Sequence, residues 1–190
     1  MKYRESGMPD EQLWTTFYSP EQILAQLDVN QNVHSLVDLG CGYGTFLLPA
    51  ARLIRGMAIG IDIEPLMIER CKQKAQAQHL KNITLLCVDI STSSTKILDD
   101  YKGTINYITL FNILHCEQPI PLLKNAYKLL NNKGKVGVIH WKQEKTPRGP
   151  SMAIRPTPET ICAWAERVGL HFVKYIELPP YHFGLLFEKL

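Results

Sequence analysis

The segment Val37-Asp38-Leu39-Gly40-Cys41-Gly42-Tyr43-Gly44-Thr45-Phe46 decides the fold of this chain. A short apolar run at 33–37 precedes the glycines and a helical pattern of apolar residues follows them, so a strand leads into a helix here. The glycines let the backbone turn sharply and lie close to a ligand. The first turn of the helix offers N–H groups that have no intrahelical partner. We therefore predict a nucleotide-like ligand at the carboxyl end of this strand.

The spacing of the glycines argues against a dinucleotide. The dinucleotide fingerprint is Gly-x-Gly-x-x-Gly, whereas here Gly44 comes one residue early and Thr45 stands in the last position. Asp38 lies two residues before the first glycine, and its carboxylate would repel a pyrophosphate. The same carboxylate favours a cationic ligand with an amino group. S-adenosylmethionine is such a ligand, because it carries a sulfonium and an α-ammonium group.

The pattern Asp-x-Gly-x-Gly-x-Gly resembles motif I of the class I S-adenosylmethionine-dependent methyltransferases. The resemblance implies an α/β fold: a Rossmann-like three-layer αβα sandwich whose seven-stranded, mostly parallel sheet has an antiparallel last strand. It also implies that residues 1–190 form a single S-adenosylmethionine-dependent methyltransferase domain. Its cofactor contacts would include Asp38, Gly40, Gly42 and Gly44.

The rest of the chain alternates apolar strands with amphipathic helices, which indicates a parallel sheet with right-handed crossovers. Residues 1–30 are expected to form an N-terminal helical cap, and 131–134 a turn. We predict strands at 33–37, 57–61, 83–88, 105–110 and 136–140, helices at 46–54, 65–79, 121–130 and 158–169, and a closing antiparallel pair at 172–178 and 182–188.

A nucleoside needs a carboxylate at the end of the second strand to accept hydrogen bonds from both ribose hydroxyls. Asp62 stands at that place, followed by Ile63, and we expect both to contact the cofactor. Glu64 is the alternative ribose partner. Asp62 could instead cap the helix that begins at Pro65. NAD-binding proteins share this carboxylate, so it supports a nucleoside without selecting the ligand.

The resemblance assigns further cofactor positions at the ends of the third and fourth strands. Asp89 would accept a hydrogen bond from the adenine amino group, and the N–H of Ile90 would donate to the ring. Dehydrogenases do not require this carboxylate, although Asp89 could also be an ordinary loop aspartate. Phe111 and Asn112 fall beside the expected methyl group, where we assign Phe111 to the cofactor and Asn112 to the substrate.

Methyl transfer from a sulfonium is an in-line displacement, so alignment and desolvation can supply much of the catalysis. His140, after the fifth strand, is the best-placed general base if one is needed; the alternative is a histidine that packs or orients the substrate. Tyr181 and His182 are further substrate-side residues. The proline-rich segment 142–158 is a predicted substrate-side loop, and its two basic residues, Arg148 and Arg155, would bind an anionic group of the substrate.

Composition sets broader limits. The 190 residues suit one domain, and a net charge of +3 gives no argument for nucleic acid, which we regard as a disfavoured partner. No apolar run approaches the length of a membrane span. The five cysteines form no Cys-x-x-Cys pair, as is typical of a cytoplasmic protein with free thiols. The histidines are scattered, so no metal site is expected.

Several further motifs resemble those of a small bacterial-type group of class I methyltransferases without an established substrate. They are Arg4-Glu5-Ser6-Gly7-Met8-Pro9, His140-Trp141, Pro147-Arg148-Gly149-Pro150, Arg155-Pro156-Thr157-Pro158-Glu159 and Pro179-Pro180-Tyr181-His182-Phe183-Gly184. The interpretation that we favour is methyl transfer to a small molecule. The alternatives are a protein or RNA methyltransferase, a non-catalytic S-adenosylmethionine-binding subunit and, from another enzyme class, an NAD-linked oxidoreductase.

Overall fold

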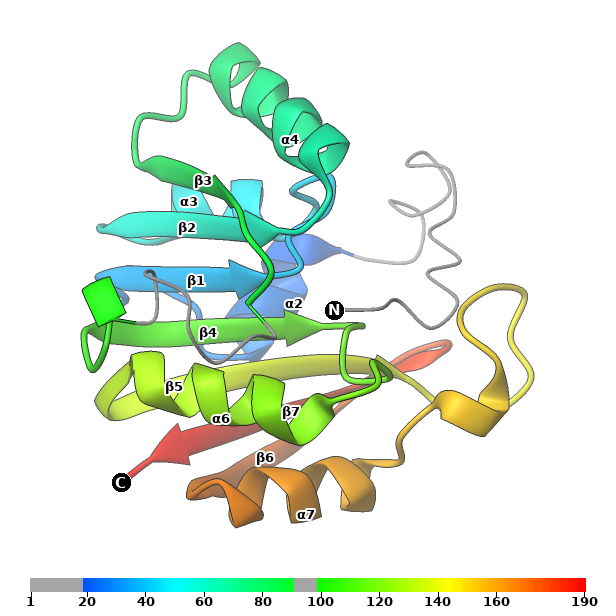
Figure 1. The fold of residues 1–190 in the computed structure, drawn as a ribbon. Coiled ribbons are helices and arrows are strands. Elements are labelled where there is room, and N and C mark those ends of the chain that lie inside the picture. Colours follow the sequence, from blue (N-terminus) through cyan, green and yellow to red (C-terminus); the bar gives the residue numbers. More distant parts are fainter. Residues whose placement is uncertain (1–18, 91–98) are drawn as a thin grey trace.

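The computed structural model describes residues 19–90 and 99–190 as an α/β sandwich (Figure 1). Seven strands form one sheet in the order β3-β2-β1-β4-β5-β7-β6. β7 runs antiparallel to its neighbours β5 and β6, and the other adjacent pairs are parallel. The predicted fold class is therefore confirmed. The elements are α2 (Pro20–Gln26), β1 (Ser35–Leu39), α3 (Leu47–Leu53), β2 (Met57–Asp62), α4 (Pro65–Ala77), β3 (Ile83–Cys87), β4 (Ile105–Phe111), α6 (Pro119–Leu129), β5 (Leu130–Trp141), the 3-10 helix η1 (Met152–Ile154), α7 (Pro158–Arg167), β6 (Leu170–Leu178) and β7 (His182–Lys189).

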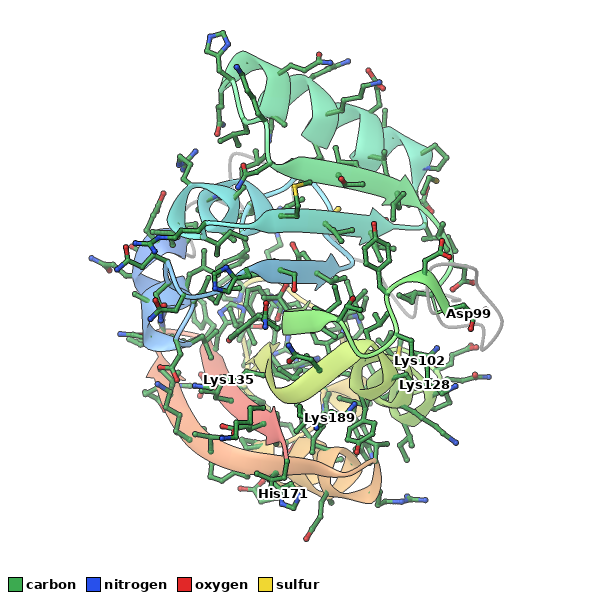
Figure 2. The ribbon with its side chains drawn as sticks, turned by 90° about the vertical axis from the view of Figure 1, so that its left-hand side faces the viewer. Asp99, Lys102, Lys128, Lys135, His171 and Lys189 are labelled. Atoms are coloured by element: carbon green, nitrogen blue, oxygen red, sulfur yellow. The ribbon has the colours of Figure 1, made fainter. Side chains whose placement is uncertain are left out.

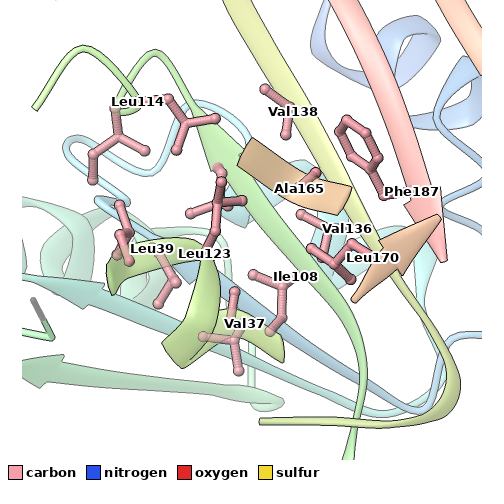
Figure 3. Close-up of a cluster of buried hydrophobic side chains, with 14 of the residues drawn as sticks. Val37, Leu39, Ile108, Leu114, Leu123, Val136, Val138, Ala165, Leu170 and Phe187 are labelled. Atoms are coloured by element: carbon pink, nitrogen blue, oxygen red, sulfur yellow. The ribbon is translucent and has the colours of Figure 1, made fainter. Parts of the chain in front are cut away.

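The central strands are apolar along their whole length because helices cover both faces of the sheet. Figure 1 shows α6 and α7 on one face, with α2 and α3 on the other. One hydrophobic cluster lies under α6 and α7, and its members include Val37, Ile108 and Val138 from three neighbouring strands (Figure 3). A second cluster joins α2, α3 and α4 to the opposite face. This packing fixes the strand ends that build the site.

The closing hairpin brings the end of β5 next to the start of β7. Trp141 pairs with His182, and His140 pairs with Phe183 in the antiparallel register. The backbone N–H of Lys142 also donates to the carbonyl of Tyr181 at 2.8 Å. The loop after β5 and the tip of the hairpin therefore lie side by side, as Figure 1 shows at the carboxyl ends of the parallel strands.

The prediction that residues 131–134 form a turn between a helix and a strand is wrong. These residues lie within β5, which begins at Leu130 rather than at residue 136. The pairing with β4 is interrupted between Ile105 and Tyr107, and Lys133 has a left-handed φ of 62°. Residues 131–134 thus form an irregularity in the pairing of β5 with β4. Their Asn and Gly residues are typical of a turn, so the sequence pattern predicts a loop at this place.

The expected N-terminal helical cap is described only in part. α2 belongs to it, whereas residues 1–18 lie outside the described residues, together with the motif at 4–9. Among residues 19–90 and 99–190, no helix is both long and apolar enough to cross a membrane.

Candidate cofactor and substrate site

The glycine loop between β1 and α3 requires glycine for packing as well as for conformation. Gly40, Gly42 and Gly44 all have left-handed φ values, of 79°, 51° and 80°. A Cβ at Gly44 would lie 2.7 Å from the sulfur of Cys71 on α4. A Cβ at Gly40 would lie 2.7 Å from Cδ1 of Ile113, after β4. Since both neighbours hold the loop closely, its backbone geometry is fixed by the core beneath it.

Asp62 connects the end of β2 to this loop. The side chain is 6% exposed, its Oδ2 accepts the N–H of Gly42 at 2.9 Å, and its Oδ1 accepts the N–H of Glu64 at 3.0 Å. The N-cap of α4 is Glu64, so Asp62 is not the cap of that helix. Each carboxylate oxygen can accept more than one hydrogen bond. Glu64, the alternative, is exposed at the surface.

Asp38 is a second buried carboxyl group, 4% exposed, at the end of β1. The hydroxyl of Thr109, its partner position on β4, donates to Oδ1 of Asp38 at 2.6 Å. Burial, which disfavours the charged form, raises the pKa of Asp38 to about 7, and the nearby charge of Asp62 acts in the same direction. The Thr109 hydrogen bond acts against this rise.

The end of β3 lies beside the end of β2 at the same edge of the sheet. The N–H of Val88 donates to the carbonyl of Asp62 at 3.0 Å. Asp89 follows and is half-buried, while Ile90 is buried and its carbonyl accepts the Nδ2–H of Asn125 on α6 at 2.8 Å. The structure thus brings Asp38, Asp62 and Asp89 to one edge of the sheet, at the ends of three adjacent strands.

The end of β4 forms the next part of this edge. The ring of Phe111 contacts Phe46 of the glycine segment edge to face, with centroids 4.6 Å apart. Asn112 has a left-handed φ of 54°, and its N–H donates to the carbonyl of Ile139 on β5 at 2.7 Å. The backbone therefore turns at Asn112, next to the loop. Ile63, the remaining predicted cofactor residue, is half-buried directly after Asp62.

His140 is fully buried near the end of β5. Its Nδ1 lies 3.3 Å from the carbonyl of Trp141, which places the proton on Nδ1 because a carbonyl can only accept. Nε2 has no hydrogen-bond partner among the described residues. Burial, followed by the nearby His115, lowers the pKa of His140 to about 3. A general base works best with a pKa near the operating pH, so this environment favours the orienting alternative.

Arg155 does not have the predicted role. The Arg155 residue is 6% exposed, and its guanidinium lies over the Trp141 ring, with the guanidinium carbon 5.4 Å from the ring centroid. All five N–H groups are used within the loop, so none is left for an anion. The prediction that Arg155 binds the substrate is therefore wrong, whereas Arg148 has an exposed side chain. The five acceptors are the carbonyls of Lys142, Glu144, Arg148 and Pro150 and the hydroxyl of Thr146, at 2.7–3.3 Å.

The sequence patterns assigned no role to Trp141, although it contacts several of the predicted substrate-side residues. Its ring packs on His182 with centroids 4.0 Å apart and stacks on Tyr181 at 6.5 Å. Burial, followed by the charge of Arg155, lowers the pKa of His182 to about 3, so this histidine is also neutral. The position of Trp141 directly after His140 was the available signal. The described residues contain no group of three or more His, Cys, Asp or Glu side chains suited to a metal.

Comparisons with known proteins found similar sequences and a similar fold. A 23S rRNA (uracil(1939)-C(5))-methyltransferase RlmD from Aliivibrio fischeri (strain MJ11) is 37% identical over 90 residues, covering 42% of this chain and 20% of the relative. The aklanonic acid methyltransferase DauC from Streptomyces sp. (strain C5) is 33% identical over 94 residues, covering 47% of this chain and 42% of the relative. The chain thus matches less than half the length of either protein.

A solved structure of a SAM-dependent methyltransferase from Aquifex aeolicus has the same fold, with a TM-score of 0.83 at 19% identity over 95% of this chain and 94% of that one. The similarity to an rRNA methyltransferase removes support from the expectation that nucleic acid is a disfavoured partner. The model of the methyltransferase domain family matches residues 31–174. This chain therefore belongs to the methyltransferase domain family.

Proposed function

We propose that this chain binds S-adenosylmethionine and transfers its methyl group to a small molecule. The observation that carries the proposal is the arrangement of Asp38, Asp62 and Asp89 at the ends of three adjacent strands around the glycine loop. A cationic nucleoside needs these groups at this edge. The glycine loop supports the same ligand, because its three left-handed glycines turn the backbone sharply at this edge of the sheet.

Each group has a distinct role in binding. Asp38 faces the α-ammonium group of the ligand, and the glycine loop lies beside its carboxylate. Asp62 accepts hydrogen bonds from the ribose hydroxyls while it holds Gly42. Asp89 and the N–H of Ile90 contact the adenine. Phe111, packed on Phe46, borders the reacting methyl group.

The bound cofactor supplies an activated methyl group, so the protein has to align the acceptor and exclude water. His140 is neutral and buried, and its Nε2 offers an acceptor that can orient a donor group of the substrate. Asn112, Tyr181 and His182 complete the substrate side. Arg148, exposed on the loop after β5, binds an anionic substrate group.

A small-molecule acceptor is supported by the similarity to an aklanonic acid methyltransferase. The similarity to an rRNA methyltransferase makes RNA the second candidate. A group of lysines does lie on the surface, but at the amino-terminal ends of the strands (Figure 2). Lys128 lies in the last turn of α6, and Lys189 is the last residue of β7. Lys135 is the first residue of β5 that pairs with β7. All three lie far from the glycine loop, which is at the other end of the strands. This group of lysines therefore does not line the edge of the sheet that holds the glycine loop, and it gives no support for RNA at that edge.

Two experiments test the proposal. Calorimetric titration with S-adenosylmethionine and, separately, with NAD should give binding heat for the first ligand; tight NAD binding without S-adenosylmethionine heat would overturn the proposed cofactor. A methyl-transfer assay should be run over a metabolite library and, separately, over total RNA, with the release of S-adenosylhomocysteine as the measured signal. We expect turnover with a metabolite. Turnover with RNA alone would replace the acceptor class, and cofactor binding without any turnover would favour a non-catalytic subunit.

A further inference from the structure

The two buried carboxyl groups before and beside the glycine loop, Asp38 and Asp62, differ in what compensates their charge. Asp62 accepts two backbone N–H groups. Asp38 accepts one hydroxyl hydrogen, from Thr109, and forms no ion pair with a Lys or Arg of the described residues. Both are more than nine-tenths buried. A buried carboxylate with one neutral partner and a second carboxyl group nearby is held more easily as the protonated acid.

The groups packed around Asp38 from the other elements give no compensating charge. β4 contributes the Thr109 hydroxyl, and β2 contributes Asp62, whose charge opposes ionisation of Asp38. The glycine loop contributes the thiol of Cys41, which is hydrogen-bonded to Cys71 of α4. The Cys71 hydrogen bond, followed by burial and by these carboxyl charges, raises the pKa of Cys41 well above its usual value, so this thiol is neutral. Within the described part of the chain, the groups named here around Asp38 are therefore neutral or acidic.

We propose that a ligand bearing an ammonium group binds at this loop only as Asp38 gives up its proton, so that cofactor binding releases a proton to solvent. The inference rests on the proposed function, because it takes the α-ammonium group of the cofactor as the partner of Asp38. In the step, the O–H bond of Asp38 breaks, the proton passes to the buffer, and the resulting carboxylate pairs with the ammonium. The ligand thus supplies a cation that residues 19–90 and 99–190 do not place beside Asp38.

The coupling makes affinity depend on pH in a defined direction. Burial raises the pKa of the free Asp38 to about 7, and pairing with a cation lowers it in the complex. Acid therefore competes with the ligand, and the Kd of the cofactor should rise about fivefold from pH 7 to pH 6. The number of protons released per ligand should be about one half at pH 7 and about nine tenths at pH 6.

The test is calorimetry at pH 6 and pH 7 in buffers of low and high ionisation enthalpy, with S-adenosylhomocysteine and S-adenosylmethionine as probes. The difference in heat between buffers gives the protons released. Both probes should release the same number, since both carry the ammonium group and only one carries the sulfonium. Asp38→Asn should bind more weakly, with no proton release and a Kd that does not change between these pH values.

Asp28→Asn is the matched control, because it removes a carboxylate that Lys135 and Lys174 already pair with, away from the site. It should release protons as the original protein does. Thr109→Val removes the hydrogen bond that favours the charged form, so its release at pH 7 should exceed one half. This second variant keeps the test available if Asp38→Asn does not fold.

The possible failures are distinct. If neither probe binds the original protein, the proposed function fails. If a probe binds at pH 6 without releasing protons, or if Asp38→Asn releases as many as the original protein, the proposed function stands and proton coupling at Asp38 is overturned.

Discussion

Asp62 and Gly42 are joined by a hydrogen bond of 2.9 Å from the Gly42 N–H to Oδ2 of Asp62, although they are 20 residues apart in sequence. The bond holds the middle of the glycine loop against the end of β2. Asp62, the residue proposed to bind ribose, therefore also holds the loop proposed to bind the rest of the ligand. A change at this position should affect both ligand binding and local stability.

Replacing Asp62 with Asn should reduce stability even without ligand. Both oxygens of the Asp62 carboxylate accept backbone N–H groups. The Asn amide has only one acceptor oxygen, so one of these backbone N–H groups would face the amide NH2 group, which is itself a donor. We expect a loss of about 1–3 kcal/mol in the free energy of unfolding, measured with urea. The exposed neighbour gives the control: Glu64→Gln should stay within about 0.5 kcal/mol. Equal stability of the Asp62 variant and the original protein would show that the loop does not depend on this carboxylate.

Gly44→Ala and Gly103→Ala separate steric packing from backbone strain. Both glycines have left-handed φ values, of 80° and 69°, so both alanines have a conformational cost of about 1–2 kcal/mol. Only at Gly44 would the new Cβ meet the Cys71 sulfur, at 2.7 Å; at Gly103 nothing lies within 4 Å. Gly44→Ala should therefore lower the midpoint of thermal unfolding more than Gly103→Ala does. Equal shifts would mean that the loop can move away from α4.

Arg155→Lys should loosen the loop after β5, because an ammonium group cannot replace five N–H donors arranged in a plane. We expect faster cleavage within 142–155 in limited proteolysis, together with a loss of about 1–3 kcal/mol in stability. Arg148→Lys keeps a charge on the exposed side chain of the same loop and should change neither. Cleavage rates that match between the two variants would contradict the anchoring role of Arg155.

Asp38 should make the ligand-free protein less stable as the pH rises. The folded-state pKa of Asp38, about 7, lies above the usual aspartate value of 3.8, so the folded protein binds more protons than the unfolded chain between these pH values. Stability should therefore fall as the pH rises from about 4 to 7 and level off above it. Asp38→Asn should raise the midpoint of thermal unfolding at pH 8 but not at pH 4. A variant that is equally destabilised at both values would show that Asp38 is not a buried acid.

His140 should stay neutral throughout the physiological range, since burial lowers its pKa to about 3. The ring-proton NMR signal that disappears in His140→Phe should not shift between pH 5 and pH 8. A shift centred near pH 6.5 would place a titrating imidazole there and restore His140 as a general base. Once a substrate is known, His140→Gln should retain more affinity than His140→Phe, because the amide oxygen still accepts a hydrogen bond.

Local sequence determined much of the cofactor side. Glycine at 40, 42 and 44, with Asp38 before them, specifies a loop whose conformation few other residues can adopt. Continuous apolar runs specify strands buried on both faces, and their alternation with helices specifies a parallel sheet. The glycine pattern and the apolar runs depend only on residues close together in the chain, so they can be recognised in the sequence before the fold is known. Asp62 and Asp89 follow because the carboxyl ends of parallel strands meet at one edge.

The tertiary structure alone decided what the basic and imidazole side chains do. In sequence, Arg148 and Arg155 are equivalent residues of one proline-rich segment; only folding places Arg155 over Trp141, where five acceptors take all its donors. Only folding buries His140 and His182 and makes them neutral. Burial, charge and hydrogen-bond partners come from segments distant in the chain. Residue type therefore predicted the location of the site, and the packing of the folded chain determined the chemistry of each group in it.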